Sequence, residues 1–136
     1  MITIKKQYDF SAEDFFNYLD KQLVADIKKA RGTNLPVKLT NGTRYKQNDI
    51  NVEITDYKRN RIYTAHFKSK QIDITISYKI QSNKDGVLLT FSENVNSYNP
   101  SNHNKISNWL YNLRLKRDAN QELKKMADNV YASLNV

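Results

Sequence analysis

The sequence contains no cysteine, only three glycines and two prolines, and two histidines among its 136 residues. Without cysteine the chain can form no disulfide and offers no thiolate ligand to a metal. A zinc site built on histidine is not expected either, because His66 and His103 are far apart in the sequence. We therefore expect a fold held by its hydrophobic core, with no metal and no cofactor.

Long apolar runs are also missing. The chain begins Met-Ile-Thr-Ile-Lys-Lys-Gln-Tyr-Asp-Phe, which is too polar for a signal peptide or a membrane span, so we expect a cytoplasmic protein. Lysine and arginine number 22 against 14 acidic residues, and the formal net charge of +8 raises the affinity for any polyanion. The length suits a single domain over residues 1–136.

The first third of the chain predicts a strand followed by a helix. Residues 1–10 alternate between apolar and polar side chains, as a strand does. Ser11 is a good helix N-cap, and Asp14 three residues later completes an acidic variant of the capping box. The helix is predicted to run to about Ala30 and to stop at Gly32.

Residues 37–97 change from helical to alternating spacing and predict an antiparallel sheet. Asn41-Gly42 predicts a two-residue hairpin turn between strands at Val37–Thr40 and Thr43–Gln47. Further strands are predicted around residues 50–54, 61–69, 72–80 and 87–95. The third of these has the cleanest alternation and should be buried on one face only.

The last quarter, Ser101 to Leu134, predicts one long amphipathic helix. Its apolar stripe consists of Ile106, Trp109, Leu110, Leu113, Leu123, Met126, Ala127, Val130 and Leu134. Polar residues interrupt the stripe at Lys116, Arg117 and Asn120. A straight helix of that length would be roughly 50 Å long, which is more than a domain of this size spans. We therefore expect it to overhang, to bend near the interruption, or to start later.

The order of these elements places the chain in the α+β class. It reads β-α-β6-α, a curved antiparallel sheet of about six to seven strands gripping a long C-terminal helix. This layout resembles the helix-grip superfamily of the START domains and the birch-pollen allergen. The sequence departs from the usual layout in having no short second helix between Ala30 and Val37.

Three segments carry a narrower resemblance. They are Phe-Ser-Ala-Glu-Asp-Phe-Phe-Asn-Tyr-Leu at 10–19, Asp-Ile-Lys-Lys-Ala-Arg-Gly at 26–32 and Leu-Lys-Lys-Met at 123–126. Together they resemble a small bacterial family from the Firmicutes, a domain of unknown function with the number 3284. That family implies no activity and no site residues. The superfamily implies a cavity between sheet and helix that often holds an apolar small molecule, although some of its members are enzymes.

The first candidate site is such a cavity. Its predicted lining is Tyr63, Phe67, Ile76, Tyr78, Phe91 and Glu93 from the sheet, with Trp109 and Leu113 from the helix. Apolar walls with a few convergent polar groups are typical of small-molecule sites. The alternative is that these residues form an ordinary close-packed core and enclose no space.

Glu93 lies on a strand face that is otherwise apolar, and two interpretations follow. If it is buried, it needs a partner such as Arg117 or Lys116, because an unpaired buried carboxylate is costly. If a bulge or the end of the strand turns it outward, it faces solvent. The sequence favours the exposed position.

The second candidate is a basic turn. Lys58, Arg59 and Arg61 lie between Tyr57 and Tyr63, and bases can stack on tyrosine while cations hold phosphates. A second basic group falls in the last helix, at Arg114, Lys116, Arg117, Lys124 and Lys125. Neither group contains a known nucleic-acid motif. Single-stranded nucleic acid is for that reason the alternative partner and not the first prediction.

Catalysis has little support in the sequence. His66 is expected to face water, and the three glycines form no phosphate-binding loop. We therefore predict a non-catalytic domain that binds a small apolar or amphipathic ligand. The alternatives are a basic nucleic-acid-binding module, an interaction protein with a filled core, and an enzyme that uses Glu93 as acid or base.

Overall fold

The structure is a computed structural model that describes residues 2–70, 72–98 and 119–134. The elements along the chain are β1 (Ile2–Tyr8), α1 (Ala12–Arg31), β2 (Arg44–Gln47), β3 (Ile50–Lys58), β4 (Ile62–Lys68), β5 (Ile72–Asn83), β6 (Gly86–Tyr98) and α3 (Ala119–Leu134). Residues 32–43 contain no helix, as the sequence predicted.

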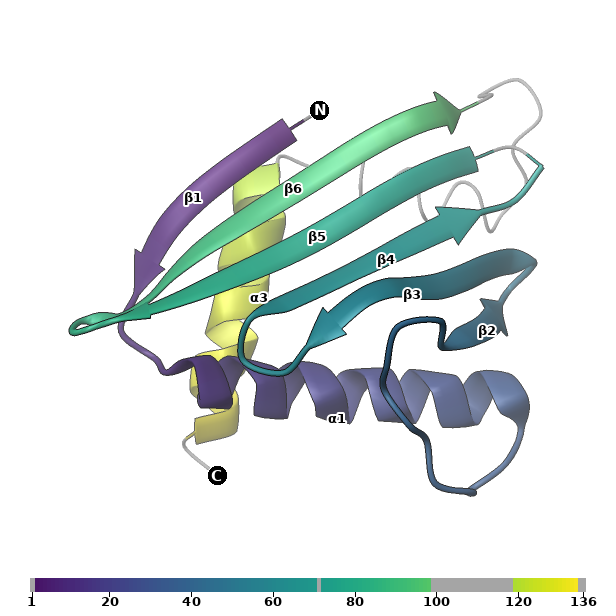
Figure 1. Ribbon diagram of the computed structural model, residues 1–136, viewed down its shortest axis with the longest axis horizontal. Helices are drawn as coiled ribbons and strands as arrows, with labels where there is room; N and C mark the ends of the chain where they lie inside the picture. Colours follow the sequence, from purple (N-terminus) through teal and green to yellow (C-terminus); the bar gives the residue numbers. More distant parts are fainter. Residues whose placement is uncertain (1, 71, 99–118, 135–136) are drawn as a thin grey trace.

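The six described strands form one antiparallel sheet in the order β1-β6-β5-β4-β3-β2. In Figure 1, α3 crosses behind β1, β6 and β5, while α1 runs along the β3 and β2 side of the sheet. The two helices contact each other, and α1 also contacts β2 and β5. The predicted α+β architecture, a curved antiparallel sheet with a C-terminal helix on one side, is therefore confirmed.

Local signals in the sequence explain both ends of α1. The Asp14 backbone N–H donates to Ser11 Oγ (3.0 Å), and the Ser11 backbone N–H donates to Asp14 Oδ2 (3.1 Å). This reciprocal pair satisfies two N–H groups that the first turn of a helix leaves free. At the other end Gly32 adopts φ 65°, a left-handed conformation that closes helices and suits glycine.

The predicted hairpin at Asn41-Gly42 is wrong, and so is the strand at Val37–Thr40. The Thr43 N–H does close a turn onto Thr40 O (3.1 Å), but β2 begins only at Arg44, and residues 37–40 join no sheet. The hydroxyl of Thr43 donates instead to Lys38 O (2.9 Å) and accepts from the Thr40 N–H (3.1 Å). Side-chain bonds of this kind replace ladder bonds and hold the segment as a loop.

The two-residue hairpin lies further along the chain, at Asn48-Asp49. Both residues have positive φ, 51° and 66°, and they join Gln47 to Ile50, which are paired in the sheet. Positive φ at both central positions defines the turn that matches the twist of a hairpin, and asparagine and aspartate tolerate it. The prediction therefore placed the hairpin at the wrong pair of turn residues.

Gly86 is required by a close approach of two strands. A Cβ atom at this position would lie 2.1 Å from Tyr8 O, and the residue has φ 129°. Any larger residue would therefore push the end of β1 away from the start of β6, where Tyr8 pairs with Val87.

Alternation along the strands gives the sheet an apolar face and a polar face. We call the side that carries the helices the inner face and the opposite side the outer face. Inner-face residues are buried along every central strand, for example Ile54, Ala65, Ile74, Ile76, Leu89 and Phe91. From the helices, Phe15, Phe16 and Ile27 of α1 and Leu123, Ala127 and Val130 of α3 complete the core.

The predicted C-terminal helix is confirmed over the part that the structure describes, Ala119–Leu134. Its buried residues recur at intervals of four and three, which keeps them on one side of the helix. The earlier part of that prediction, including Trp109, Leu113, Lys116 and Arg117, lies outside the described residues.

Candidate functional site

The sheet brings together all six residues that it was predicted to contribute to a cavity. Across the inner face Tyr63 is opposite Tyr78, and Tyr78 is opposite Phe91. One row further along, Ile76 is opposite Glu93. Phe67 pairs with Ile74 in the next row. The two predicted helix residues, Trp109 and Leu113, lie outside the described part of the chain.

Tyr78 is the centre of an aromatic cluster. Its ring centroid lies 6.3 Å from that of Tyr63 and 5.2 Å from that of Phe91. Phe15 of α1 approaches from the helix side, with a centroid distance of 5.7 Å. Distances in this range are typical of favourable aromatic pairs. The cluster therefore joins three strands to the first helix.

Burial differs among these residues in an informative way. Tyr63, Ile76, Phe91 and Glu93 are 2–5% exposed, as core residues are. Phe67 and Tyr78, however, are only partly buried, although β4 and β5 lie inside the sheet. Part of the surface of two inner-face residues, on strands that are not at the edge of the sheet, is therefore accessible.

Glu93 is buried, at 2% exposure, so the exposed position favoured by the sequence is wrong. The irregularity in β6 does not fall at Glu93. The register between β5 and β6 shifts between Asp73 and Ile74, two residues beyond the pairing of Ile76 with Glu93. Because the alternation is intact up to that point, Glu93 keeps the inward orientation of Phe91. Its suggested partners, Arg117 and Lys116, lie outside the described residues.

Tyr8 belongs to the same face and was missed by the sequence analysis. It pairs with the buried Val87, and its ring stacks on Phe10 with a centroid distance of 5.0 Å. Its hydroxyl oxygen is buried and has no hydrogen-bond partner within the described part of the chain. Burial, followed by nearby Tyr131, Asp128 and Tyr78, raises the pKa of Tyr8. One signal in the sequence could have identified Tyr8. In an alternating strand it falls on the same face as Ile4, four residues earlier.

The basic turn after β3 is occupied by contacts within the protein. Arg59 forms an ion pair with Asp20 of α1 and donates to Asn17 Oδ1. The Tyr57 hydroxyl donates to the same aspartate, Asp20 Oδ1, at 2.6 Å. Burial first, and then the hydrogen bond to Asp20, raise the pKa of Tyr57. The second flanking ring, Tyr63, is 5% exposed and cannot stack on a base without rearrangement. Lys58 and Arg61 remain exposed.

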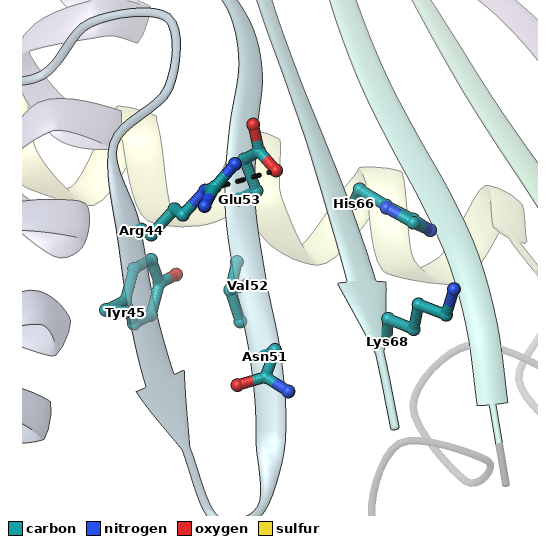
Figure 2. Close-up of a pocket in the computed structure, with 7 residues that line it drawn as sticks. All are labelled: Arg44, Tyr45, Asn51, Val52, Glu53, His66 and Lys68. Atoms are coloured by element: carbon teal, nitrogen blue, oxygen red, sulfur yellow. Dashed lines mark ion pairs between the residues drawn. The ribbon is translucent and has the colours of Figure 1, made fainter. Parts of the chain in front are cut away.

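A shallow hollow of about 410 Å³ lies on the outer face of the sheet, at the β2–β3–β4 end (Figure 2). Arg44 and Glu53 form a cross-strand ion pair at 3.4 Å on one of its walls. On the other wall Figure 2 shows His66 and Lys68 pointing away from that pair. The hollow combines two cations, Arg44 and Lys68, with one carboxylate, Glu53, and we assign no ligand to it.

His66 lies on the polar face, as expected, but it is partly buried and bonded to Asp73 of β5. Hydrogen bonds from His66 first, and then from Asn96 (3.2 Å), lower the pKa of Asp73. His66 pairs with Thr75 across the two strands, so it is a residue of the outer face. Among the described residues, no cluster of acidic and histidine side chains could hold a metal ion.

Comparison with solved structures identifies the fold. Protein MLL2253 from Mesorhizobium loti has a TM-score of 0.61 at 12% identity, over 98% of this chain and 96% of its own. Ara h 8.0201 has a TM-score of 0.60 at 8% identity, over 97% and 94%. The di-domain ARO/CYC StfQ from the steffimycin biosynthetic pathway has a TM-score of 0.57 at 11% identity. This chain is covered over 99% of its length and StfQ over 51%.

At these identities the likeness establishes the helix-grip fold and nothing more. No protein with a curated description matches the sequence. Within the described residues, no helix is both long enough and apolar enough to cross a membrane. A family model does match, over residues 2–116, which is most of the chain. The chain therefore belongs to the family described as "Domain of unknown function (DUF3284)".

Proposed function

We propose that this chain is a single domain that binds a small apolar or amphipathic ligand against the inner face of its sheet and does no chemistry of its own. The proposed lining is Tyr63, Phe67, Ile76, Tyr78, Phe91 and Glu93, together with Trp109 and Leu113. The observation that carries the proposal is the accessible surface left on Phe67 and Tyr78, which lie on the apolar inner face of two strands inside the sheet.

The chemistry of the lining suits a ligand with an apolar body and one polar end. Tyr63, Tyr78 and Phe91 form a continuous aromatic row, and its partly exposed member, Tyr78, together with the partly exposed Phe67, offers apolar surface on which a flat or aliphatic body can pack. Glu93 is the only acidic residue buried among the described ones, and it lies in the adjacent row. Mostly apolar walls with a few placed polar groups are the usual composition of such sites.

Binding rather than catalysis is proposed because of where the reactive groups lie. His66 and Asp73 are bonded to each other on the outer face, on the opposite side of the sheet from the aromatic row. StfQ is an ARO/CYC protein of a biosynthetic pathway. This likeness supports only the view that the fold is compatible with binding a small molecule. A catalytic role for Glu93 remains the third alternative.

Binding of a fluorescent apolar probe tests the proposal. We expect anilinonaphthalene sulfonate to gain fluorescence with the folded protein and to raise its melting temperature. Phe67→Asn places a polar group on the wall and should weaken probe binding about tenfold. Lys68→Asn, on the next residue and exposed, is the matched control and should leave binding unchanged. Lack of binding by the wild type, or equal binding by the two variants, would overturn the proposal.

The role of Glu93 is tested with two ligands of similar shape and opposite charge, 1-naphthylmethylammonium and 1-naphthaleneacetate. Glu93→Gln removes the charge and keeps the shape of the side chain. We expect the variant to lose preference for the amine over the acid, measured by displacement of the fluorescent probe. If stability and both affinities are untouched, Glu93 does not belong to the site.

Single-stranded nucleic acid at Lys58, Arg59 and Arg61 is the competing function. It has less support, because Arg59 is held by Asp20 and Asn17. A nucleic-acid module should be retained on heparin with a steep salt dependence, and retention should drop in a Lys58→Gln/Arg61→Gln double variant. Retention that is indifferent to these two residues would exclude this turn as the interface.

A further inference from the structure

The end of α1 and the loop that follows it combine two unusual features. Leu35 is 70% exposed, the largest exposed fraction among the large apolar side chains that the structure describes. The last turn of α1 immediately before it carries Lys28, Lys29 and Arg31. In Figure 1 this loop projects from the end of α1 on the side away from the sheet.

Hydrogen bonds hold Leu35 in this position. The Thr33 N–H donates to Lys28 O (3.2 Å), and the Leu35 N–H donates to Thr33 Oγ1 (3.2 Å). Gly32 closes the helix with bonds to Lys28 O and Lys29 O. The leucine is therefore presented by a bonded loop beside the cations.

The cations at this end of the molecule are available to a partner. Lys28, Lys29 and Lys46 take part in none of the ion pairs formed within the described part of the chain. Two hollows flank Lys29. One, of about 430 Å³, is bordered by Lys28, Gly32 and Thr33, and the other, of about 320 Å³, is bordered by Lys46. Asp26 lines the second hollow and is the nearby counter-charge.

Charge is distributed unevenly along α1. The first turn carries Glu13 and Asp14, whereas three of the four basic residues of the helix lie in its last turn and the fourth, Lys21, lies in the middle. The helix therefore has an acidic end and a basic end, and a negatively charged surface would approach the basic end, where Leu35 is exposed.

We propose that Leu35, with Lys28, Lys29 and Lys46, forms a docking surface for an anionic lipid bilayer. Lipid explains both features at once, because headgroups attract the lysines and the acyl boundary accepts the leucine. Nucleic acid would use the cations only, since an aliphatic side chain offers no stacking face. Binding is peripheral and reversible.

The direct test is sedimentation with large unilamellar vesicles of phosphatidylcholine alone or with about 30% phosphatidylglycerol. Three lysines near the surface should favour the anionic vesicles by roughly 10²-fold at low salt. In about 0.5 M salt the preference should largely disappear, because the charges are screened.

Variants separate local docking from net charge. Leu35→Ser and Lys28→Gln/Lys29→Gln should each weaken binding to anionic vesicles about tenfold. Lys5→Gln/Lys6→Gln removes the same charge from β1, the edge strand opposite β2 in the sheet (Figure 1), and should have little effect. Leu35 is exposed, so its replacement should leave the melting temperature unchanged.

Three results would overturn the proposal. They are absence of binding to anionic vesicles, equal weakening by the two double variants, and retention of full binding by Leu35→Ser. Tight binding of single-stranded DNA that Leu35→Ser leaves intact, without vesicle binding, would assign the basic surface to nucleic acid instead. None of these results bears on the ligand site of the inner face, which the naphthalene probes test separately.

Discussion

The two faces of β4 and β5 differ in the kind of contact that their side chains make. On the inner face Ala65, Ile74 and Ile76 are 0–2% exposed and touch other apolar groups. On the outer face Thr64 and Ser77 share a hydrogen bond of 3.0 Å, and His66 is bonded to Asp73. The inner face therefore stabilises the fold by excluding water from apolar groups. The outer face stabilises it through partly solvated polar pairs, which contribute much less to the free energy of unfolding.

The largest expected difference between the faces comes from adjacent residues of β5. Ile74→Ala removes a fully buried inner-face side chain and should lower the free energy of unfolding by about 2–5 kcal/mol. Thr75→Ala, one residue along on the outer face, should change it by less than about 0.5 kcal/mol. Urea denaturation of both variants measures the contrast, and equal losses would contradict it.

A second difference concerns alkaline pH. Tyr45 pairs with Val52 on the inner face, and burial, followed by nearby Asp26, raises its pKa to about 12. Because the ionised form is disfavoured in the folded state, the contribution of Tyr45 is complete below pH about 10 and is lost as pH rises toward 12. As the pH rises from about 10 to about 12, the Tyr45→Phe variant should therefore lose on the order of 2 kcal/mol less of its free energy of unfolding than the wild type loses. Parallel curves for the two proteins would refute this.

A third comparison uses two hydroxyl groups at the inner face. Tyr57→Phe removes a hydroxyl that donates to Asp20, and should cost about 1–2 kcal/mol. Tyr8→Phe removes a buried hydroxyl without a partner among the described residues, and should be neutral or slightly stabilising. Thermal or urea unfolding distinguishes the two. A marked loss in Tyr8→Phe would mean that its hydroxyl has a bound partner.

The smallest expected effect lies on the outer face at acid pH. The pKa of Asp73 is lowered by the bonds from His66 and Asn96, so its contribution is present above pH about 4 and is lost as pH falls through the lowered value. Asp73→Asn should therefore flatten the acid limb of the stability curve while changing stability little at neutral pH. An unchanged acid limb would show that the pair contributes nothing measurable.

Local sequence signals predicted α1 well, because a helix end depends on residues only a few positions apart. Ser11, Asp14 and Gly32 form the caps that their spacing indicates. The strands of the central sheet were also found, since Ile72, Ile74 and Ile76 alternate without interruption. The same alternation is the reason that the six sheet residues proposed for the site all lie on one face.

The failures occurred where two local signals were equally good or where distant strands decide the outcome. Asn41-Gly42 is as good a turn as Asn48-Asp49, but only the second pair is flanked by two segments that join the sheet. Glu93 is polar, and its burial follows from the register of β6 on β5, which the chemistry of residue 93 does not reveal.

Neighbouring residues alone account for the features that act within a turn of helix or a few residues of strand: the caps of α1, the two faces of each strand, and the basic end next to Leu35. Tertiary contacts account for the rest. They joined Tyr57 to Asp20, 37 residues apart, placed Tyr8 beneath α3, and buried Glu93. The physical reason is that burial and pairing depend on which distant segments meet, and a pattern of neighbouring residues carries no information about that meeting.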